Sequence, residues 1–256
     1  MTHASESQHW YTREGEPCYT VKAKDGSDRP ATLRDARKLN LVPSVTSIIR
    51  CAASPGLEYW KQQQVLMAAL TLPKIDGEAE GAYLQRILND SREQAKKAAE
   101  RGTAIHAAIQ GFYQGEPPSP EDFRQYVLGA QETVSKWLPS TVWVAERSFS
   151  HALGFGGKVD LCGVGVVDFK TKEFDTTADL KTWDEHAMQL AAYRHGLGLE
   201  KARCAIVYVS STVPGLTKLI EIQEDELQRG WTCFYSLLHY WQAKNTYRSA
   251  FERLAA

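Results

Sequence analysis

The sequence lacks the features that mark several large classes of protein. No apolar run approaches the length of a membrane span, and the polar stretch from Met1 to Gln8 lacks the apolar core of a signal peptide. We therefore expect no membrane partner. The formal net charge is only −1, so the chain has no global basic signature. Any contact with nucleic acid must then come from a local patch.

Cysteine is scarce and follows no metal-ligand spacing. The five cysteines are scattered, odd in number and never arranged as Cys-x-x-Cys. Such a set predicts reduced thiols and a cytoplasmic location. The chain also has no internal repeat and no low-complexity tract. With 256 residues and an apolar fraction of 43%, it can form one large domain or two small ones.

Hydrophobic periodicity predicts both helices and strands. Near the N-terminus we expect a hairpin between residues 9–12 and 18–21, a loop over 24–30, and a helix capped by Ser44. Further expected helices span 32–39, 57–70, 83–114, 121–138, 183–196 and 224–244, and expected strands span 141–150, 202–210 and 216–222.

The most informative stretch runs from Gly154 to Lys172. It is typical of two short strands joined by a glycine-rich turn centred near Val164. Residues equidistant from that turn are cross-strand partners, so Asp160 is expected opposite Asp168. Strand alternation then places three residues on one face (Asp168, Lys170, Lys172) and two on the other (Phe169, Thr171).

Two carboxylates and an ammonium thus meet beside an apolar run. A core strand rarely directs Asp and Lys inward unless they bind something. Metal-assisted phosphodiester hydrolysis uses such a trio, because carboxylates hold a hard cation and a nearby lysine orients a water. The alternative is a hairpin whose charges pair with one another in solvent.

Four motifs in a fixed order resemble the PD-(D/E)XK nuclease superfamily. Its RecB-type exonuclease branch, which includes phage and mitochondrial genome maintenance exonucleases, carries Gly-x-x-x-His, Gly-x-x-Asp, Asp-hydrophobic-Lys and Gln-x-x-x-Tyr. The corresponding segments here are Gly102–His106, Gly157–Asp160, Asp168–Lys170 and Gln189–Tyr193. They span a little over a third of the chain.

The resemblance implies a fold and an activity. The expected fold is a single α/β domain, with a mixed central sheet flanked by helices as in restriction endonucleases and a helix-rich N-terminal half. Residues 1–82 would be an N-terminal extension and 83–256 the nuclease core. The implied activity is a DNA exonuclease that uses Mg²⁺ or Mn²⁺ on single-stranded or frayed ends, in phage or bacterial replication, recombination or repair.

The resemblance also assigns roles to residues. Asp160 and Asp168 would ligate the metal together with His106 and the backbone carbonyl of Phe169, while Lys170 would position the attacking water. Gly102 would let the helix of His106 approach its neighbour closely, although a lone helical histidine is more often a core residue.

Other residues have two open interpretations. Glu146 would reach a second metal or support the first, or it is an ordinary edge-strand charge. Gln189 and Tyr193, four apart on one helix face, would hold the DNA strand, or form a hydrogen-bonding pair on the helix. Lys96, Lys97, Arg101 and Lys172 would line a DNA channel.

Some alternatives concern the whole function. An endonuclease on branched or duplex DNA would use the same Asp/Asp/Lys set, and a nucleic-acid-binding module with a vestigial site is a third option. Some RecB-type relatives carry an iron–sulfur cluster on clustered cysteines, which this sequence does not have, so we expect no iron–sulfur cluster. A recombination protein or a single-strand-binding protein would be a reasonable partner.

Overall fold

The structure, a computed structural model, describes residues 9–53, 55–117 and 121–247. Its centre is a five-stranded sheet in the order β5-β6-β7-β8-β9. The three leading strands form an antiparallel meander, β8 runs parallel to β7, and β9 returns antiparallel to β8. The mixed sheet confirms the expected fold class. Its strands are β5 (Val144–His151), β6 (Phe155–Cys162), β7 (Gly165–Lys172), β8 (Arg203–Ser210) and β9 (Thr217–Ile222).

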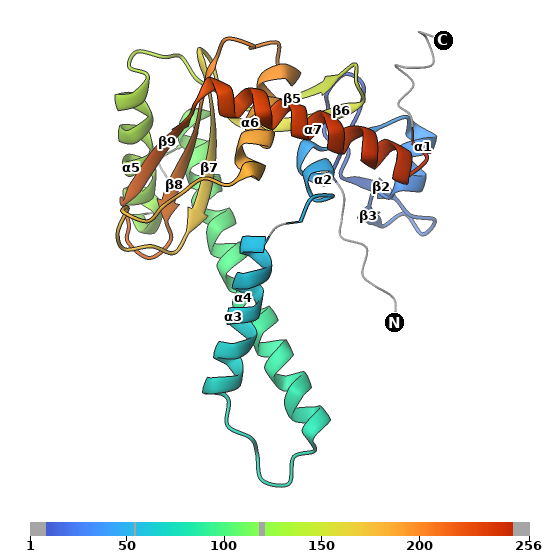
Figure 1. Cartoon of the computed structure of the whole chain (residues 1–256), viewed down its shortest axis with the longest axis vertical. Helices are drawn as coiled ribbons and strands as arrows, with labels where there is room; N and C mark the ends of the chain where they lie inside the picture. The colour runs from blue at the N-terminus through green and yellow to red at the C-terminus, as the bar shows by residue number, and fades with distance from the viewer. Residues whose placement is uncertain (1–8, 54, 118–120, 248–256) are drawn as a thin grey trace.

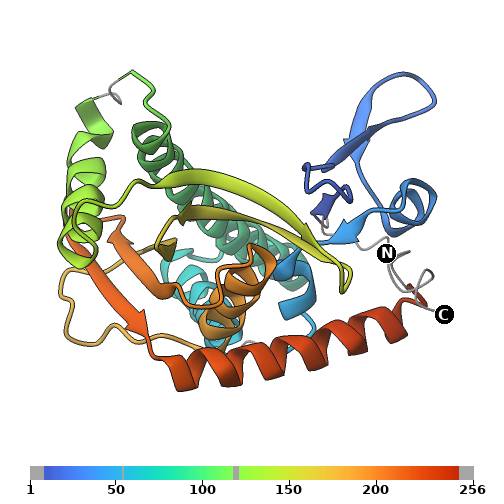
Figure 2. The same ribbon diagram turned by 90° about the horizontal axis from the view of Figure 1, so that it is seen from above.

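Helices cover both faces of this sheet (Figure 2). Helix α6 (Asp184–Gly196) forms the crossover that parallel β7 and β8 require, and it packs with α7 (Glu224–Lys244) on one face. Helix α5 (Glu121–Trp137) and the C-terminal half of α4 (Glu80–Tyr113) cover the other. Alternate residues of β7 therefore enter different cores: Val166 packs on the α6 side, whereas Val167 and Phe169 pack on the α4 side.

A helical arm projects from the body of the protein (Figure 1). It consists of α3 (Pro55–Thr71) and the N-terminal half of the 34-residue α4. The arm exposes several large apolar side chains, with Leu70 81% accessible. Only the C-terminal half of α4 reaches the sheet. The helix therefore connects the arm to the region of Gly102 and His106. Within the described residues, no helix is both long and apolar enough to cross a membrane.

The N-terminal lobe pairs differently from the expected hairpin. Strand β1 (Trp10–Tyr11) pairs with β4 (Val42–Pro43), while β2 (Thr20–Lys22) pairs with β3 (Asp28–Pro30), a segment expected to be a loop. Segments 9–12 and 18–21 form no strand ladder with each other; they are joined by a backbone hydrogen bond from Cys18 N to Trp10 O and by a bond between the Tyr11 and Tyr19 hydroxyls, both at 2.8 Å. The reason is burial: Trp10 is fully buried and packs edge-on against Trp241 of α7.

Two short helices complete this lobe, α1 (Leu33–Leu39) and α2 (Val45–Ile49). Ser44 caps α2 as expected, because its Oγ accepts a hydrogen bond from Ser47 N at 3.1 Å. Helix α2 packs on α6 and α7, and Trp10 shares the apolar core on that side of the sheet. The lobe is therefore packed against the central sheet and does not hang free from it.

Candidate active site

The site forms where β6 and β7 separate. Their ladder contains only Leu161↔Val167 and Cys162↔Val166, and it ends one pair before Asp160 would face Asp168. Instead, the Asp160 carboxylate accepts a hydrogen bond from Phe169 N at 2.7 Å. The two ladder pairs have the register expected from a turn centred near Val164, but Asp160 and Asp168 do not themselves form a ladder pair. The split turns the two carboxylates toward different neighbours, Asp160 toward α4 and Asp168 toward α6.

On the α4 side, three potential metal ligands converge. His106 Nε2 lies 2.9 Å from Asp160 Oδ2. Glu146 lies between two paired residues of β5, Ala145 and Arg147, which places it across the ladder from Asp160. One ligand atom from each of His106, Glu146 and Asp160 lies within 4.8 Å of the others. One imidazole and two carboxylates are a donor set that can bind a divalent metal ion.

Glu146 adopts an unusual backbone conformation. Its φ is +55°, a region that residues with a side chain seldom occupy, least of all inside a strand. Such strain persists where the surroundings impose it, and it clusters at functional sites. The Glu146 side chain is 10% exposed and forms an ion pair with Lys158. We infer that the positive φ of Glu146 directs its carboxylate toward Asp160.

On the α6 side, Asp168 belongs to a buried polar network. Lys170 Nζ lies 2.6 Å from Asp168 Oδ2 and donates to Gln189 Oε1 at 3.0 Å. Gln189 Nε2 in turn donates to Asp168 Oδ1 at 2.9 Å and to Tyr193 OH at 2.8 Å. Gln189 and Tyr193 are both buried, so their polar atoms hold Asp168 and Lys170 in position. Contact of either residue with DNA stays a prediction.

Burial and mutual attraction act on the pKa values of both Asp168 and Lys170. Burial raises the pKa of Asp168 and the nearby Asp160 charge adds to this, while the Lys170 ammonium opposes it. Burial by itself would lower the pKa of Lys170, but the Asp168 carboxylate outweighs burial, so the pKa is raised and Lys170 stays charged at neutral pH. Beyond the Lys170 ion pair, no hydrogen bond from the described residues reaches Asp168 Oδ2.

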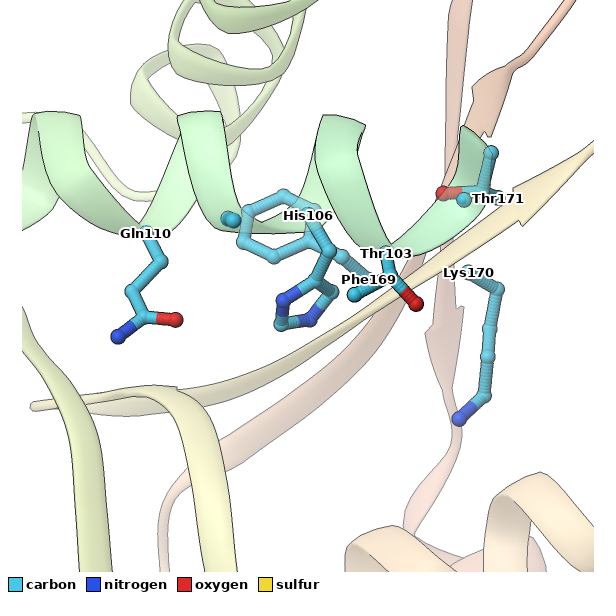
Figure 3. A pocket seen from close by; sticks show the side chains of 8 residues that line it. Thr103, His106, Gln110, Phe169, Lys170 and Thr171 are labelled. Atoms are coloured by element: carbon cyan, nitrogen blue, oxygen red, sulfur yellow. The ribbon is translucent and has the colours of Figure 1, made fainter. Parts of the chain in front are cut away.

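A pocket of about 390 Å³ opens beside these groups. Figure 3 shows His106 and Gln110 pointing from α4 toward the strand that carries Phe169 and Lys170. The lining residues are Gly102, Thr103, His106, Ala107, Gln110, Phe169, Lys170 and Thr171. The pocket therefore gives a ligand access to His106 and Lys170 together.

Two motif glycines have different physical roles. A Cβ on Gly102 would lie 3.5 Å from Thr171 Cβ, an ordinary van der Waals contact, so the absence of a side chain at Gly102 is not what allows α4 to approach its neighbour there. A Cβ on Gly157 would lie 2.9 Å from ring atoms of both Phe149 and Tyr193. Gly157 thus leaves room for the tyrosine that holds Gln189, which links two of the sequence motifs physically.

Gly157→Ala is accordingly expected to destabilise the fold by about 1–3 kcal/mol, because the added methyl group overpacks two rings. It should also lower activity, since Tyr193 must shift. Chemical unfolding checks the first effect. The control is Gly81→Ala, a helical position with nothing within 4 Å of the added carbon, which should change stability by less than about 1 kcal/mol. Equal stability of the two variants would contradict the packing role.

Three of the four proposed DNA-binding cations have partners within the protein. Lys96 and Lys97 lie on the exposed face of α4 within 3.7 Å of Glu100 and 2.9 Å of Glu93, respectively. Arg101 donates to Ser211 O and to Tyr126 OH, both at 2.8 Å, and so anchors α4 to the core. Lys172 is exposed at the end of β7. A DNA-binding role for these four residues stays a prediction.

Sequence reasoning missed Lys158 as a member of the site. It lies two residues before Asp160 on β6, so strand alternation alone places both side chains on one face. It also missed the pocket residues Thr103 and Gln110, which share the helix face of His106 at helical spacing. Both signals were present in the sequence, but neither type of residue stands out without the fold.

Metal binding at His106 is expected to weaken as pH falls. Burial would lower the pKa of His106, but the Asp160 carboxylate more than compensates, so the pKa is raised above 6.5. Below that pKa the imidazole is protonated and paired with Asp160, and a metal must displace the proton. The apparent Kd for Mn²⁺ should therefore rise about tenfold per pH unit below the His106 pKa.

Calorimetric Mn²⁺ titrations at pH 6 and pH 8 measure this effect. His106→Ala should bind Mn²⁺ more weakly at pH 8 and show a smaller change between the two pH values. His239→Ala, a change at an exposed position of α7, is the matched control and should behave as the parent. A parent protein with equal affinity at both pH values would exclude His106 as a ligand.

Comparison with known proteins adds limited information. No family model matches the chain, and no curated protein matches it. Among solved structures, a candidate exonuclease from Eubacterium rectale is similar over 59% of this chain and 71% of its own, with 14% identity and a TM-score of 0.42. The protein SSO0001 is similar over 71% of this chain and 86% of its own, with 16% identity and a TM-score of 0.28. At this level of similarity, the function has to be argued from the site.

Proposed function

We propose that this protein is a metal-dependent deoxyribonuclease that cleaves DNA from single-stranded or frayed ends. One observation carries the proposal: the split between β6 and β7 brings His106, Glu146 and Asp160 together beside Asp168 and Lys170, next to an open pocket. Carboxylates and a lysine rarely share a buried strand end without a ligand. The proposed setting is cytoplasmic DNA replication, recombination or repair.

The residues present fit a divalent cation. His106, Glu146 and Asp160 would hold it, and the Asp168 Oδ2 atom, buried with Lys170 as its ion-pair partner, offers a further oxygen. Oxygen ligands suit Mg²⁺, and the imidazole favours Mn²⁺. When bound, such a cation lowers the pKa of a water and neutralises charge on the phosphate.

The chain's own groups supply the remaining steps. The Lys170 ammonium would orient the attacking water and stabilise the charge that develops on the phosphate. It could do so efficiently because it is already held in place and need not move as the reaction proceeds. Gln189 fixes Lys170 and Asp168 relative to each other, since it bonds to both. Tyr193 fixes Gln189. These two would be positioning residues for the hydrolysis.

Cleavage from ends is favoured over internal cleavage by the charge distribution. An enzyme that grips internal duplex sites gains from many phosphate contacts, which a net charge of −1 does not favour. A single strand passing a pocket needs only local cations. We therefore expect a free DNA end to be required.

A closed single-stranded circle and its linear form, offered at equal concentration with Mn²⁺, separate the two modes. The linear form should disappear and release mononucleotides or short oligonucleotides from the earliest times, while the circle persists. Loss of the circle at a comparable rate would show that ends are not needed, and an endonuclease would replace the exonuclease. Binding of both forms without cleavage of either would indicate a vestigial site.

A further inference from the structure

One face of β6 carries a row of three positions that leads from the site toward the N-terminal lobe. Asp160, Lys158 and Gly156 alternate with buried apolar positions, so they lie on the same face. Asp160 meets His106, and Lys158 meets Glu146. At about 3.3 Å per residue, Lys158 lies about 7 Å along the strand from Asp160. Lys158 is thus a second lysine of the site, reached along β6, whereas Lys170 lies on β7.

The N-terminal lobe occupies the end of this row. A Cβ on Gly156 would lie 2.9 Å from Tyr11 Cβ, so Tyr11 fills the space that the glycine leaves. Tyr11 OH is hydrogen-bonded to Tyr19 OH at 2.8 Å. His9 stacks on Tyr19 with ring centroids 4.4 Å apart and an interplanar angle of 24°. An exposed imidazole on a half-buried phenol ring therefore lies beyond Lys158.

The charges along the row suit a phosphodiester followed by a base. The site would repel DNA in the absence of positive charge, because it contains the carboxylates of Asp160, Glu146 and Asp168. The Lys158 ammonium supplies one positive charge beside Glu146. An ammonium has three donors, so Lys158 can keep its bond to Glu146 and still donate to a phosphate oxygen. Burial lowers the pKa of His9, and the nearby charges of Arg50 and Lys158 lower it further. At neutral pH His9 is thus a flat, uncharged ring.

We propose that Lys158 and the stacked His9–Tyr19 pair bind the nucleotide next to the one being cleaved, with the ammonium on its phosphate and the rings against its base. This inference rests on the proposed nuclease function and adds a nucleotide subsite that the N-terminal lobe builds. Stacking on aromatic rings is tolerant of sequence, so the subsite would hold any base. It would raise affinity for a strand without taking part in the chemistry.

Two substrates separate binding at this subsite from catalysis. Bis(p-nitrophenyl) phosphate has a phosphodiester but no neighbouring nucleotide, whereas an end-labelled single-stranded oligonucleotide has both. For the double variant His9→Ala/Tyr19→Leu, we expect KM for the oligonucleotide to rise about tenfold with kcat unchanged, and hydrolysis of the small diester should stay at the parent rate. For Lys158→Gln, which also breaks the ion pair with Glu146, we expect KM for the oligonucleotide to rise about tenfold more than KM for the small diester. Lys158→Gln should also make the slope of log K against log [salt] for oligonucleotide binding shallower by about 0.7, the value for one lost phosphate contact on a single strand.

The chain offers matched controls. Tyr235 and His239 of α7 form a second Tyr–His pair, exposed and edge-to-face, also with centroids 4.4 Å apart, on the α7 side of the sheet. Tyr235→Leu/His239→Ala and Lys218→Gln, on the edge strand β9, should leave both substrates unaffected. An oligonucleotide with an abasic site should bind the parent more weakly than the intact strand, and the His9/Tyr19 variant should not distinguish the two.

Three results would overturn the subsite. Variants with parent-like KM on the oligonucleotide would remove it and leave the nuclease intact. An equal loss on the small diester would show that Lys158 acts through Glu146 on the chemistry and not on a neighbouring nucleotide. If the parent protein hydrolyses neither substrate with Mg²⁺ or Mn²⁺, the proposed nuclease function falls and the subsite falls with it.

Discussion

Lys170→Ala is expected to slow DNA cleavage by ~10²-fold or more while DNA binding is nearly retained, the scale seen when one preorganised electrostatic group is lost. The variant keeps both carboxylates and the His106–Asp160 contact, so metal binding should persist. Turnover of a labelled single strand and fluorescence anisotropy of the same strand measure the two effects. Anisotropy is measured with Ca²⁺ in place of the active metal.

Removal of Lys170 also leaves Asp168 without its ion-pair partner at a buried position. Breaking such a pair destabilises a fold, so thermal unfolding must be followed in the presence of metal. Lys170→Gln, which can still bond to Gln189, is the variant to use if the alanine protein does not fold. Lys218→Ala on β9 is the control for loss of a positive charge. Turnover within about threefold of the parent in a folded Lys170 variant would exclude this strand end as the active site.

Removal of the metal is expected to abolish cleavage. Asp160→Asn is expected to slow cleavage by at least ~10²-fold even at saturating metal. The asparagine oxygen can still accept the hydrogen bond from Phe169 N, so the local fold should survive. What disappears is the negative charge that His106 and a cation share. Dialysis against chelator followed by readdition of Mg²⁺ or Mn²⁺ measures the first effect.

Calorimetric titration with Mn²⁺ tests the same residue without an activity assay. Asp160→Asn and Glu146→Gln should both weaken Mn²⁺ binding, because each removes a charged oxygen from the cluster. Glu132→Gln, on the exposed face of α5, is the matched control and should bind as the parent does. Undiminished cleavage in excess chelator would exclude a metal-dependent mechanism, and unchanged Mn²⁺ affinity in both site variants would relocate the metal.

Several features of this protein follow from the sequence by itself. The alternation in β7 separates Asp168 and Lys170 from Phe169, because a strand has a period of two whatever surrounds it. The four-residue spacing of Gln189 and Tyr193 brings their side chains together, since helix geometry makes such residues neighbours. Ser44 caps α2 by accepting a hydrogen bond from the backbone of Ser47, three positions further along the chain. All three depend on local backbone geometry, which a pattern of residues is enough to predict.

Other features were decided only by the tertiary structure. The end of the β6–β7 ladder before Asp160 and the positive φ of Glu146 appear only in the assembled sheet, whose opposite faces are covered by α4 and α6. The pairing of β1 with β4 depends on the burial of Trp10 against α7. Lys158 joins the site because β5 brings Glu146 beside it. Contacts between segments distant in the sequence leave no periodic signal, because each segment's own pattern is compatible with more than one partner.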